Sequence, residues 1–323
     1  MLDTRARISS DTRPSVLVAG SVNCDLVLRT PRLPCAGESV MGTQYCRVAG
    51  GKGANQAVAI ARLGATATFV GKTGTDSEGE TLRARLCAEG VRTEFVSCCA
   101  SAPTGLAVIT VDDRGGNSIV VIPGANSLVT GEDVQIALRA GWYDALLLQF
   151  EIPPQTVMAA CRLAQAQGVP IVLDAGPAQE FPLEQLRGVH ILTPNETETL
   201  ALTGIDPDTP RAAQTATGIL LRRSRANAVV LKLGGRGALL CSRDGSCEHM
   251  PAYAIDAVDT TAAGDAFTAA MTVEYVQSGD LRKAVMRGNA AGALAAMNLG
   301  AQPSLPTAHV LDEFCARQVA HAG

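Results

Sequence analysis

Short runs of continuously apolar residues recur along the chain and alternate with segments of helical pattern. The runs have the length and composition of strands buried on both faces, and they are SVLVAG at 15–20, ALLLQF at 145–150, PIVLDA at 170–175, HILTP at 190–194 and AVVLKLG at 228–234. Apolar residues at 154–168 and 209–225 follow helical spacing, and the first of these segments ends at Gly168. This alternation predicts an α/β fold with a mainly parallel sheet covered by helices on both sides.

Two regions break the alternation. Residues 22–50 and 102–123 contain strand-like stretches with no room for crossover helices, and DDRGGN at 112–117 is a strong turn signal. We therefore expect a small antiparallel sheet that projects from the main domain and covers a cleft as a lid. Residues 15–323 are expected to form one domain with this lid, and the polar residues 1–14 a flexible extension.

The composition restricts the class of protein. A net charge of −4 gives the chain no general attraction for nucleic acid or an anionic membrane, and no apolar run approaches the ~20 residues of a membrane span. A cytoplasmic enzyme is therefore expected, with neither nucleic acid nor membrane as partner. The ten cysteines contain no C-x-x-C motif and the four histidines are scattered, so neither a zinc site nor a redox dithiol is supported. We expect the cysteines to be reduced and to act as small apolar fillers.

The segment AGGKGANQAVAIARLGA at 49–65 surrounds Lys52 with glycines where a helix is predicted to begin. Glycine has no Cβ and adopts positive φ, so backbone N–H groups can approach a polar ligand there, and the helix start adds positive partial charge. Asn55 offers a donor and an acceptor to hydroxyl groups. The alternative is a tight loop before a closely packed helix, which is as consistent with this segment taken alone. A Walker loop is excluded by the order of the residues.

Polar residues also follow the first predicted strand, in GSVNCD at 20–25. Ligands of open α/β sheets bind at the carboxyl ends of the strands. Asn23 and Asp25 are two positions apart, so on an extended segment their side chains point to the same side and can bind adjacent hydroxyls of a polyol. A turn that ends the strand, held by an Asx side chain, is the competing interpretation.

The stretch VDTTAAGDAFTAAM at 258–271 begins a helix whose first turn contains Ala263, Gly264 and Asp265. An acid in a first turn usually only compensates the helix dipole. The free N–H groups of that turn can, however, surround the oxygens of a phosphoryl group while a neighbouring carboxylate serves as the base. Because histidines are scarce, Asp265 is the best placed candidate for a general base.

TPNETETL at 193–200 places Asn195 and Glu198 on one face of another starting helix. Oxygen ligands of this type suit magnesium, generally through water. The alternative is an N-capped helix with an acidic first turn.

These motifs resemble the ribokinase (PfkB) family of carbohydrate kinases. GGKGANQA matches the first family signature and DTTAAGDAF the second, and the similarity extends from about Ser15 to GAQPSLP at 300–306. Within the family, GSVNCD, GGKGANQA, PNETE and GAQPS look more like the branch that phosphorylates D-ribose than the fructose, adenosine or phosphosugar branches. The resemblance implies a ribokinase-like three-layer αβα sandwich. It also implies transfer of the γ-phosphate of ATP to the 5-hydroxyl of D-ribose, giving ribose 5-phosphate and ADP.

The resemblance assigns roles residue by residue. Asp265 would be the base, and Ala262, Ala263 and Gly264 would form the anion hole for the γ-phosphate. The sugar site would comprise Asn23, Asp25, Gly51, Lys52, Asn55 and Glu151. The nucleotide would contact Asn195, Lys232, Gly234, Gly235, Gly237 and Asn289, and Glu198 would organise the waters of Mg²⁺. An activating K⁺ would bind Asp259, Thr261, Ala295, Asn298, Gly300 and Ser304, several through backbone carbonyls only. The lid of the family also implies a homodimer contact.

The sequence departs from the family pattern at three positions. Ala262 replaces the more frequent glycine of the second signature, so its backbone must keep a negative φ for the anion hole to remain intact. Lys232 stands where many relatives carry threonine, and Asp174 where asparagine is frequent. Nucleotide affinity or preference could differ as a result.

Several alternatives remain open on the sequence. The nearest is a sister kinase for another sugar, such as deoxyribose or fructose, or for a nucleoside. A noncatalytic sugar or nucleotide sensor would be expected to have lost its base, whereas Asp265 is present. An α/β dehydrogenase would show G-x-G-x-x-G after the first strand, where this chain has GSVNCD.

Overall fold

The computed structural model describes residues 13–322, and residues 1–12 of the expected N-terminal extension lie outside this range. Regular structure begins at strand β1 (Ser15–Ala19), which lies inside a nine-stranded sheet of the described residues. The other strands, in spatial order from one edge, are β13 (Cys247–Met250), β12 (Ala238–Ser242), β11 (Ala228–Lys232), β10 (Val189–Thr193), β9 (Ile171–Asp174), β8 (Ala145–Leu148), then β4 (Thr66–Gly74) and β5 (Arg92–Cys99) beyond β1. Neighbours from β5 to β11 pair in parallel, and β12 and β13 add an antiparallel edge.

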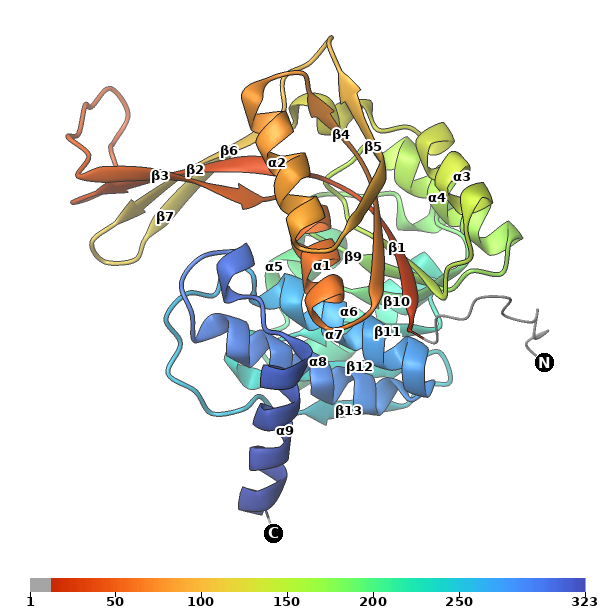
Figure 1. Cartoon of the computed structure of the whole chain (residues 1–323). Helices are drawn as coiled ribbons and strands as arrows, with labels where there is room; N and C mark the ends of the chain where they lie inside the picture. The colour runs from red at the N-terminus through yellow and green to blue at the C-terminus, as the bar shows by residue number, and fades with distance from the viewer. Residues whose placement is uncertain (1–12, 323) are drawn as a thin grey trace.

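Helices cover both faces of the main sheet (Figure 1). One face packs against α1 (Lys52–Arg62), α2 (Ser77–Ala88), α7 (Ala263–Ser278), α8 (Leu281–Ala296) and α9 (Ala308–Ala322). The other packs against α3 (Gly131–Ala140), α4 (Pro154–Ala166), α5 (Glu196–Thr203) and α6 (Pro210–Ser224). Short 3₁₀ helices lie at Gly124–Leu128, Leu183–Gln185, Gly234–Arg236 and Gln302–Ser304. The predicted α/β sandwich is confirmed.

Alternation of side chains along the strands explains why the apolar runs are continuous. In β1, Val16 and Val18 belong to the core beneath α1 and α7, whereas Leu17 and Ala19 belong to the core beneath α3 and α4. Because successive side chains of a strand point to opposite faces, a strand between two helical layers needs an apolar residue at every position. Burial of each such side chain contributes roughly 1.5–3 kcal/mol.

The order of the strands reverses at β1. From β1 the chain passes through α1 to β4 on one side, and the later strands β8 to β11 build outward on the other side. The connections that follow β1 and β8 therefore run in opposite directions along the sheet. A crevice outside such a switch point is where ligands of open α/β sheets bind.

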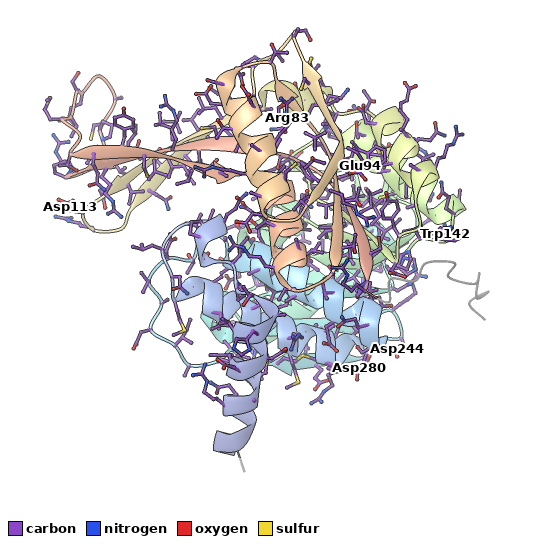
Figure 2. The ribbon with its side chains drawn as sticks, in the orientation of Figure 1. Arg83, Glu94, Asp113, Trp142, Asp244 and Asp280 are labelled. Atoms are coloured by element: carbon purple, nitrogen blue, oxygen red, sulfur yellow. A yellow bond between two sulfur atoms is a disulfide. The ribbon has the colours of Figure 1, made fainter. Side chains whose placement is uncertain are left out.

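A second, four-stranded sheet projects from the main body (Figure 1). It contains β2 (Asn23–Thr30), β3 (Gln44–Gly50), β6 (Gly105–Asp112) and β7 (Asn117–Ile122) in the order β3-β2-β6-β7, and we call it the projecting sheet. The β6–β7 turn closes through the carboxylate of Asp112, which accepts from the backbone N–H groups of Arg114 and Gly116 at 2.9 and 2.8 Å. Asp113 lies at the far end of this turn (Figure 2).

The expected small antiparallel sheet is present, but it contains one parallel pair at its centre. β2–β3 and β6–β7 are antiparallel hairpins, but β2 and β6 pair in parallel. Both of these strands leave the main body in the same direction, and the long connection through α1, β4, α2 and β5 lies between them. The absence of crossover helices within each hairpin says nothing about how two separate hairpins pair.

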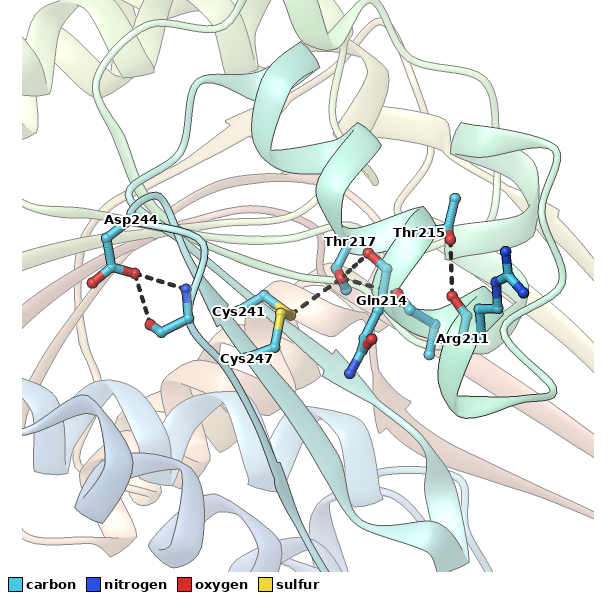
Figure 3. Close-up of a disulfide and its surroundings, with 9 residues drawn as sticks. Arg211, Gln214, Thr215, Thr217, Cys241, Asp244 and Cys247 are labelled. Carbon is cyan, nitrogen blue, oxygen red and sulfur yellow. Dashed lines mark hydrogen bonds between the residues drawn. A yellow bond between two sulfur atoms is a disulfide. The ribbon is translucent and has the colours of Figure 1, made fainter.

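The cysteines also depart from expectation at one pair (Figure 3). Cys241 and Cys247 are directly opposite each other on β12 and β13 and form a disulfide, whereas the other eight cysteines of the described residues are free. The turn between them is closed by Asp244, whose Oδ1 accepts from the N–H and the hydroxyl of Ser246. The absence of a C-x-x-C motif did not exclude this pairing because a hairpin turn brings cysteines six residues apart face to face.

None of the helices formed by residues 13–322 is long and apolar enough to cross a membrane.

Candidate active site

The site begins where β1 and β8 end. The backbone after β1 contacts the start of α1, where Gly51 has a φ of 88° and a Cβ on Gly53 would come within 2.7 Å of the backbone nitrogen of Ser21. Gly51 and Gly53 are therefore required by close packing of backbone on backbone, as the tight-loop interpretation expected, whereas a Cβ on Gly50 would meet the carboxylate of Asp25. The carboxylate of Glu151, after β8, joins the two segments: it accepts from the hydroxyl of Ser21 and, at 2.9 Å, from the backbone N–H of Lys52.

Asn23 and Asp25 are the first and third residues of β2, so they do not form a turn that ends a strand. Both are buried. The amide of Asn126 fixes Asn23, donating from Nδ2 to its Oδ1 at 2.7 Å, and also accepts from the N–H of Val22 at 2.9 Å. Since the oxygen of Asn23 is occupied, its amide nitrogen remains as the donor available to a ligand.

Asp25 is a buried carboxyl with an unused acceptor. Its Oδ1 has no hydrogen-bond partner within the described part of the chain. Burial, followed by the negative charges of Glu151 and Asp265, raises the pKa of Asp25 to about 7. An acceptor left unpaired in this way is stabilised when a ligand hydroxyl donates to it.

Asp265 lies in the first turn of α7 and is buried, with amides from α1 holding both of its oxygens. Asn55 Nδ2 donates to Oδ2 at 2.9 Å, and Gln56 Nε2 donates to Oδ1 at 3.0 Å. Lys52 Nζ is 3.8 Å from Oδ1. Burial raises the pKa of Asp265 to about 6, against the lowering effect of Lys52. The carboxylate is thus fixed in orientation and more basic than an exposed aspartate.

The N-terminus of α7 is open. Its N-cap residue, Ala262, provides no side-chain hydrogen bond and has a φ of −109°, so alanine is tolerated there. The N–H of Ala263 donates to the carbonyl of Thr260, and beyond it Gly264 leaves space on the cavity side. The N–H groups of Gly264 and Asp265, which follow in this turn, are available to an anion.

Asn195 and Glu198 form a capping box at the start of α5. Asn195 Oδ1 accepts from the N–H of Glu198 at 2.8 Å, and Glu198 Oε2 accepts from the N–H of Asn195 at 2.7 Å. The capping interpretation of this motif is therefore correct. Glu198 is buried and its second oxygen lies 4.0 Å from Lys52 Nζ. Burial raises the pKa of Glu198.

The two unusual residues Asp174 and Lys232 contact each other. Lys232 Nζ donates to Asp174 Oδ1 at 2.6 Å, and the other carboxylate oxygen accepts from Gln56 Nε2 at 2.8 Å and lies 3.5 Å from Lys52 Nζ. Burial alone would raise the pKa of Asp174, but the two ammonium groups lower it, so the carboxylate remains ionised. Burial would likewise lower the pKa of Lys52, but Asp174, Asp265 and Glu198 raise it well above its usual range.

A cavity of about 540 Å³ opens in front of these groups. It is lined by most of the residues expected to contact nucleotide and phosphate, namely Lys52, Asn195, Lys232, Gly234, Gly235, Gly237, Ala263, Gly264, Asp265 and Asn289. Asn289 donates weakly to the carbonyl of Pro251 at 3.3 Å. A volume of this size suits a nucleotide-sized ligand.

The segments expected to bind a monovalent cation meet beside the start of α7. Asp259 Oδ1 accepts from the N–H of Thr261 at 3.0 Å, and Oδ2 accepts from the N–H of Gly300 at 2.8 Å. Asn298 donates through Nδ2 to the carbonyl of Leu294, so its side-chain oxygen remains as a possible ligand, whereas the hydroxyl of Ser304 donates to the carbonyl of Ala301. All candidate donors are oxygens, as a hard cation requires. Residues 13–322 contain no group of three or more His, Cys, Asp or Glu that could hold a metal.

Sequence reasoning missed the residues that hold the site together. Gln56 and Gln149 are fully buried, and Gln149 Nε2 donates to Gln56 Oε1 at 2.6 Å, which fixes the direction of the Gln56 amide. Asn126 carries no motif of its own. A glutamine beside Asn55 in the glycine-rich segment and a glutamine at the end of an apolar strand were visible signals, because such polar residues are rarely buried unless they are hydrogen-bonded.

Comparison with known proteins places these features in context. The model of the pfkB family of carbohydrate kinases matches residues 13–308. Ribokinase of Haemophilus influenzae is 36% identical over 307 residues, which is 94% of this chain and 98% of that protein. Deoxyribokinase of Salmonella typhi is 32% identical over 301 residues, 93% of this chain and 98% of that protein. The structure of Arabidopsis thaliana ribokinase complexed with ribose and ATP superposes with a TM-score of 0.84 at 32% identity, covering 94% of this chain and 99% of that chain.

Proposed function

Because the chain belongs to the pfkB family of carbohydrate kinases, we propose that it transfers the γ-phosphate of ATP to the 5-hydroxyl of D-ribose. The products are ribose 5-phosphate and ADP. The observation that carries this proposal is the position of Asp265, a buried base candidate in the same helical turn as an uncapped N-terminus. The substrate is inferred from ribokinase relatives and from the solved relative that holds ribose and ATP.

The proposed reaction uses Asp265 as general base. Its carboxylate takes the proton of the 5-hydroxyl as the oxygen forms a bond to the γ-phosphorus, and the bond between that phosphorus and the β–γ bridging oxygen breaks to release ADP. The free N–H groups of Gly264 and Asp265 would stabilise the negative charge on the transferring group, beside the backbone of Ala263. Ala262 contributes through its backbone. The pKa of about 6 leaves Asp265 ionised at neutral pH.

The sugar is proposed to bind at the base of the projecting sheet. The unpaired acceptors of Asp25 and Asn55 would accept from its hydroxyls, and the free amide nitrogen of Asn23 would donate. Lys52 would donate to the sugar as well, while Gly51 and Glu151 shape the loop. Together these groups would offer donors and acceptors to several hydroxyls. The proposed set includes no dedicated site for a sugar phosphate, so it suits an unphosphorylated sugar.

The nucleotide is proposed to occupy the cavity in front of α7. Asn195 and Lys232 would contact its phosphates, Gly234, Gly235 and Gly237 would line its ribose and base, and Asn289 would lie near the adenine. All six residues line the cavity. The reaction is proposed to take place in the cytoplasm, where ATP is available.

Two cations complete the proposal. Glu198 would orient the waters of a Mg²⁺ bound to the nucleotide phosphates, since its second oxygen remains unbonded to the backbone. K⁺ would bind between the segments joined by Asp259, with Thr261, Ala295, Asn298, Gly300 and Ser304 as donors. A cation there would supply positive charge that orders the loop before the anion hole.

A homodimer through the projecting sheet, acting as a lid over the sugar, is supported by its exposed apolar residues. Every residue of β7 is exposed, including Ile119, Val120 at 60% and Val121, and Tyr45 of β3 is 67% exposed. An exposed edge strand can pair with another chain, and an exposed apolar patch often marks a protein–protein interaction site. A second copy of the same sheet would provide that cover.

Deoxyribose is the second candidate substrate, because the Salmonella typhi deoxyribokinase covers almost the whole chain. The test is ADP release with ATP and magnesium, with D-ribose, 2-deoxyribose, fructose, fructose 6-phosphate and adenosine offered in parallel, with and without potassium. Preference for ribose, enhanced by potassium, is the expected result. Preference for another acceptor would reassign the sugar, and no turnover with any of them would favour a noncatalytic sensor.

A further inference from the structure

Asp174 and Lys232 are two of the three positions that depart from the family pattern, and they are hydrogen-bonded to each other. Their side chains come from the ends of β9 and β11, and the ammonium and carboxylate are 2.6 Å apart. Asp174 is fully buried and Lys232 is 7% exposed. A buried ion pair is often no more stabilising than an apolar pair of the same size, so stability alone does not account for it.

Lys232 lies beside the open helix start. A methyl group built on Gly264 would be 3.8 Å from Lys232 Nζ, and both residues line the cavity. The ammonium therefore adjoins the turn whose N–H groups are free. Lys52 also approaches this turn, with its Nζ 3.8 Å from Asp265 Oδ1. Two cations and one helix N-terminus thus converge on one region of the cavity.

One carboxylate positions all of these groups. Asp174 Oδ1 holds Lys232, while Oδ2 accepts from Gln56 and lies 3.5 Å from Lys52. The same amide nitrogen of Gln56 donates to Asp265 Oδ1 at 3.0 Å, so Asp174 is connected to the base candidate through a single side chain. Gln149 fixes the far side of that amide. A shift of Asp174 would move both cations and loosen the base together.

We propose that Lys232 contacts the phosphoryl group in transfer and that Asp174 is its positioning residue, so that the two act as one unit. The inference rests on the proposed kinase function. Lys232 neutralises charge that develops on the phosphoryl oxygens, and Asp174 prevents the flexible lysine from leaving the helix start. The long stem of lysine would otherwise lose this position through its rotamer freedom.

The test is a double-mutant cycle with Lys232→Met, Asp174→Asn and the double variant. Lys232→Met keeps the length of the side chain and removes its charge, and we expect kcat to fall on the order of 10²-fold. The loss of kcat caused by Asp174→Asn should be at least about tenfold smaller in the Lys232→Met background than in the wild type. The effects of residues that act as a unit are not additive. Lys72→Met, which breaks a strand-to-helix pair with Asp133 outside the cavity, is the matched control and should leave kcat unchanged.

A binding measurement separates this role from a merely structural one. By calorimetry, Lys232→Met should weaken binding of a non-hydrolysable ATP analogue roughly tenfold and leave binding of AMP unchanged, because only the former brings a terminal phosphate to Lys232. Lys232→Arg keeps the positive charge and should therefore keep the wild-type difference in affinity between the ATP analogue and AMP. Equal losses for both nucleotides, or an Asp174→Asn cost that is the same in both backgrounds, would overturn the proposal.

These results stand apart from the proposed function. If the wild type fails to phosphorylate any sugar, the proposed function fails, while the difference between the triphosphate analogue and AMP still tests the contact. If Asp174→Asn does not fold, as thermal unfolding would show, the comparison of Lys232→Met with Lys232→Arg in nucleotide binding decides.

Discussion

Two helices begin at the cavity, and both carry an acid at the third position of the first turn. In α5 that acid is Glu198, and it returns to the N-cap backbone to complete a capping box with Asn195. In α7 it is Asp265, and it points away to Asn55 and Gln56 of α1. The same sequence feature therefore closes one helix start and leaves the other open.

The identity of the N-cap residue accounts for this difference. Asn195 has a side-chain oxygen that satisfies a backbone N–H, whereas Ala262 has none. A satisfied cap stabilises the helix, while an open one retains N–H groups for a ligand. We therefore expect changes at α7 to act on turnover and changes at α5 to act mainly on stability.

The largest effect is expected for Asp265→Asn. The amide keeps the shape of the side chain but cannot accept the proton of the sugar hydroxyl, so kcat should fall by roughly 10²–10⁴-fold. Ribose affinity, measured by calorimetry, should survive because most contacts to the sugar remain. The measurement is ADP release under saturating substrates.

The matched control is Asp280→Asn. Asp280 caps α8 and accepts from the N–H of Lys283 at 3.0 Å; it is exposed, is labelled in Figure 2, and does not line the cavity. Asparagine caps as well as aspartate, so this variant should keep both stability and turnover. Turnover near the wild-type level in Asp265→Asn would remove the assigned base.

Gly264→Ala should separate stability from activity in α7. A Cβ at this position meets only Lys232 Nζ at 3.8 Å, so the folded chain can accommodate it. The methyl group would enter the space that a phosphoryl group needs, and we expect kcat to fall on the order of 10²-fold. Replacing a helical glycine by alanine should leave the free energy of unfolding unchanged or raise it by up to about 1 kcal/mol, which thermal unfolding would detect.

Gly218→Ala in α6 serves as its control. A Cβ there is 3.5 Å from the end of Arg222, an ordinary contact, and the position is remote from the cavity. It should gain similar stability without loss of turnover. Equal activity in the two glycine variants would mean that the α7 start does not hold the phosphoryl group.

The pH dependence sharpens the comparison further. With the pKa of Asp265 at about 6, kcat/KM should fall about tenfold per pH unit below that value, because the base becomes protonated. Glu198→Gln should preserve this acidic limb even where it lowers the rate. If the midpoint of the acidic limb lay near 3.8, the ordinary pKa of aspartate, burial would not raise the pKa of the base.

The same shift predicts how stability changes with pH. Because the pKa is higher in the folded state than in the unfolded chain, the folded state retains a proton that the unfolded chain releases. The contribution of Asp265 to the free energy of unfolding is therefore largest below the unfolded value and decreases as pH rises to about 6. Asp265→Asn should make this slope shallower in urea titrations at matched pH values, while Asp25, whose pKa is raised to about 7, continues to contribute in the same direction.

The sequence predicted the elements of the main sheet because apolar runs and helical spacing are local. The strands at 15–20 and 228–234 and the helix at 154–168 were correctly located. The parallel pairing of β2 with β6 and the disulfide of β12 and β13 were not predicted, because they depend on which distant or opposing segments meet. The same limitation explains why Asp174 and Lys232 were seen as separate departures.

The site divides in the same way. The base candidate and the residues proposed to bind the sugar were predicted from short motifs and a family resemblance, and the family is confirmed by the match over residues 13–308. The residues that orient them, Gln56, Gln149 and Asn126, are single polar side chains within apolar segments. Their importance arises from hydrogen bonds to residues more than 90 positions away in the sequence. No local sequence pattern reveals such contacts.

The smallest effect is expected at the start of α5. Asn195→Ala removes the side-chain acceptor for the N–H of Glu198 and should cost about 1 kcal/mol of stability. Thr209→Ala, which removes the cap of α6 away from the cavity, should cost a similar amount and leave the kinetics unchanged. Asn195→Asp keeps the cap and should preserve stability, but its charge would repel the nucleotide and raise KM for ATP roughly tenfold at low salt. If Asn195→Ala lowered kcat as much as Gly264→Ala does while stability stayed constant, the two helix starts would share one role and the distinction between a closed and an open cap would fail.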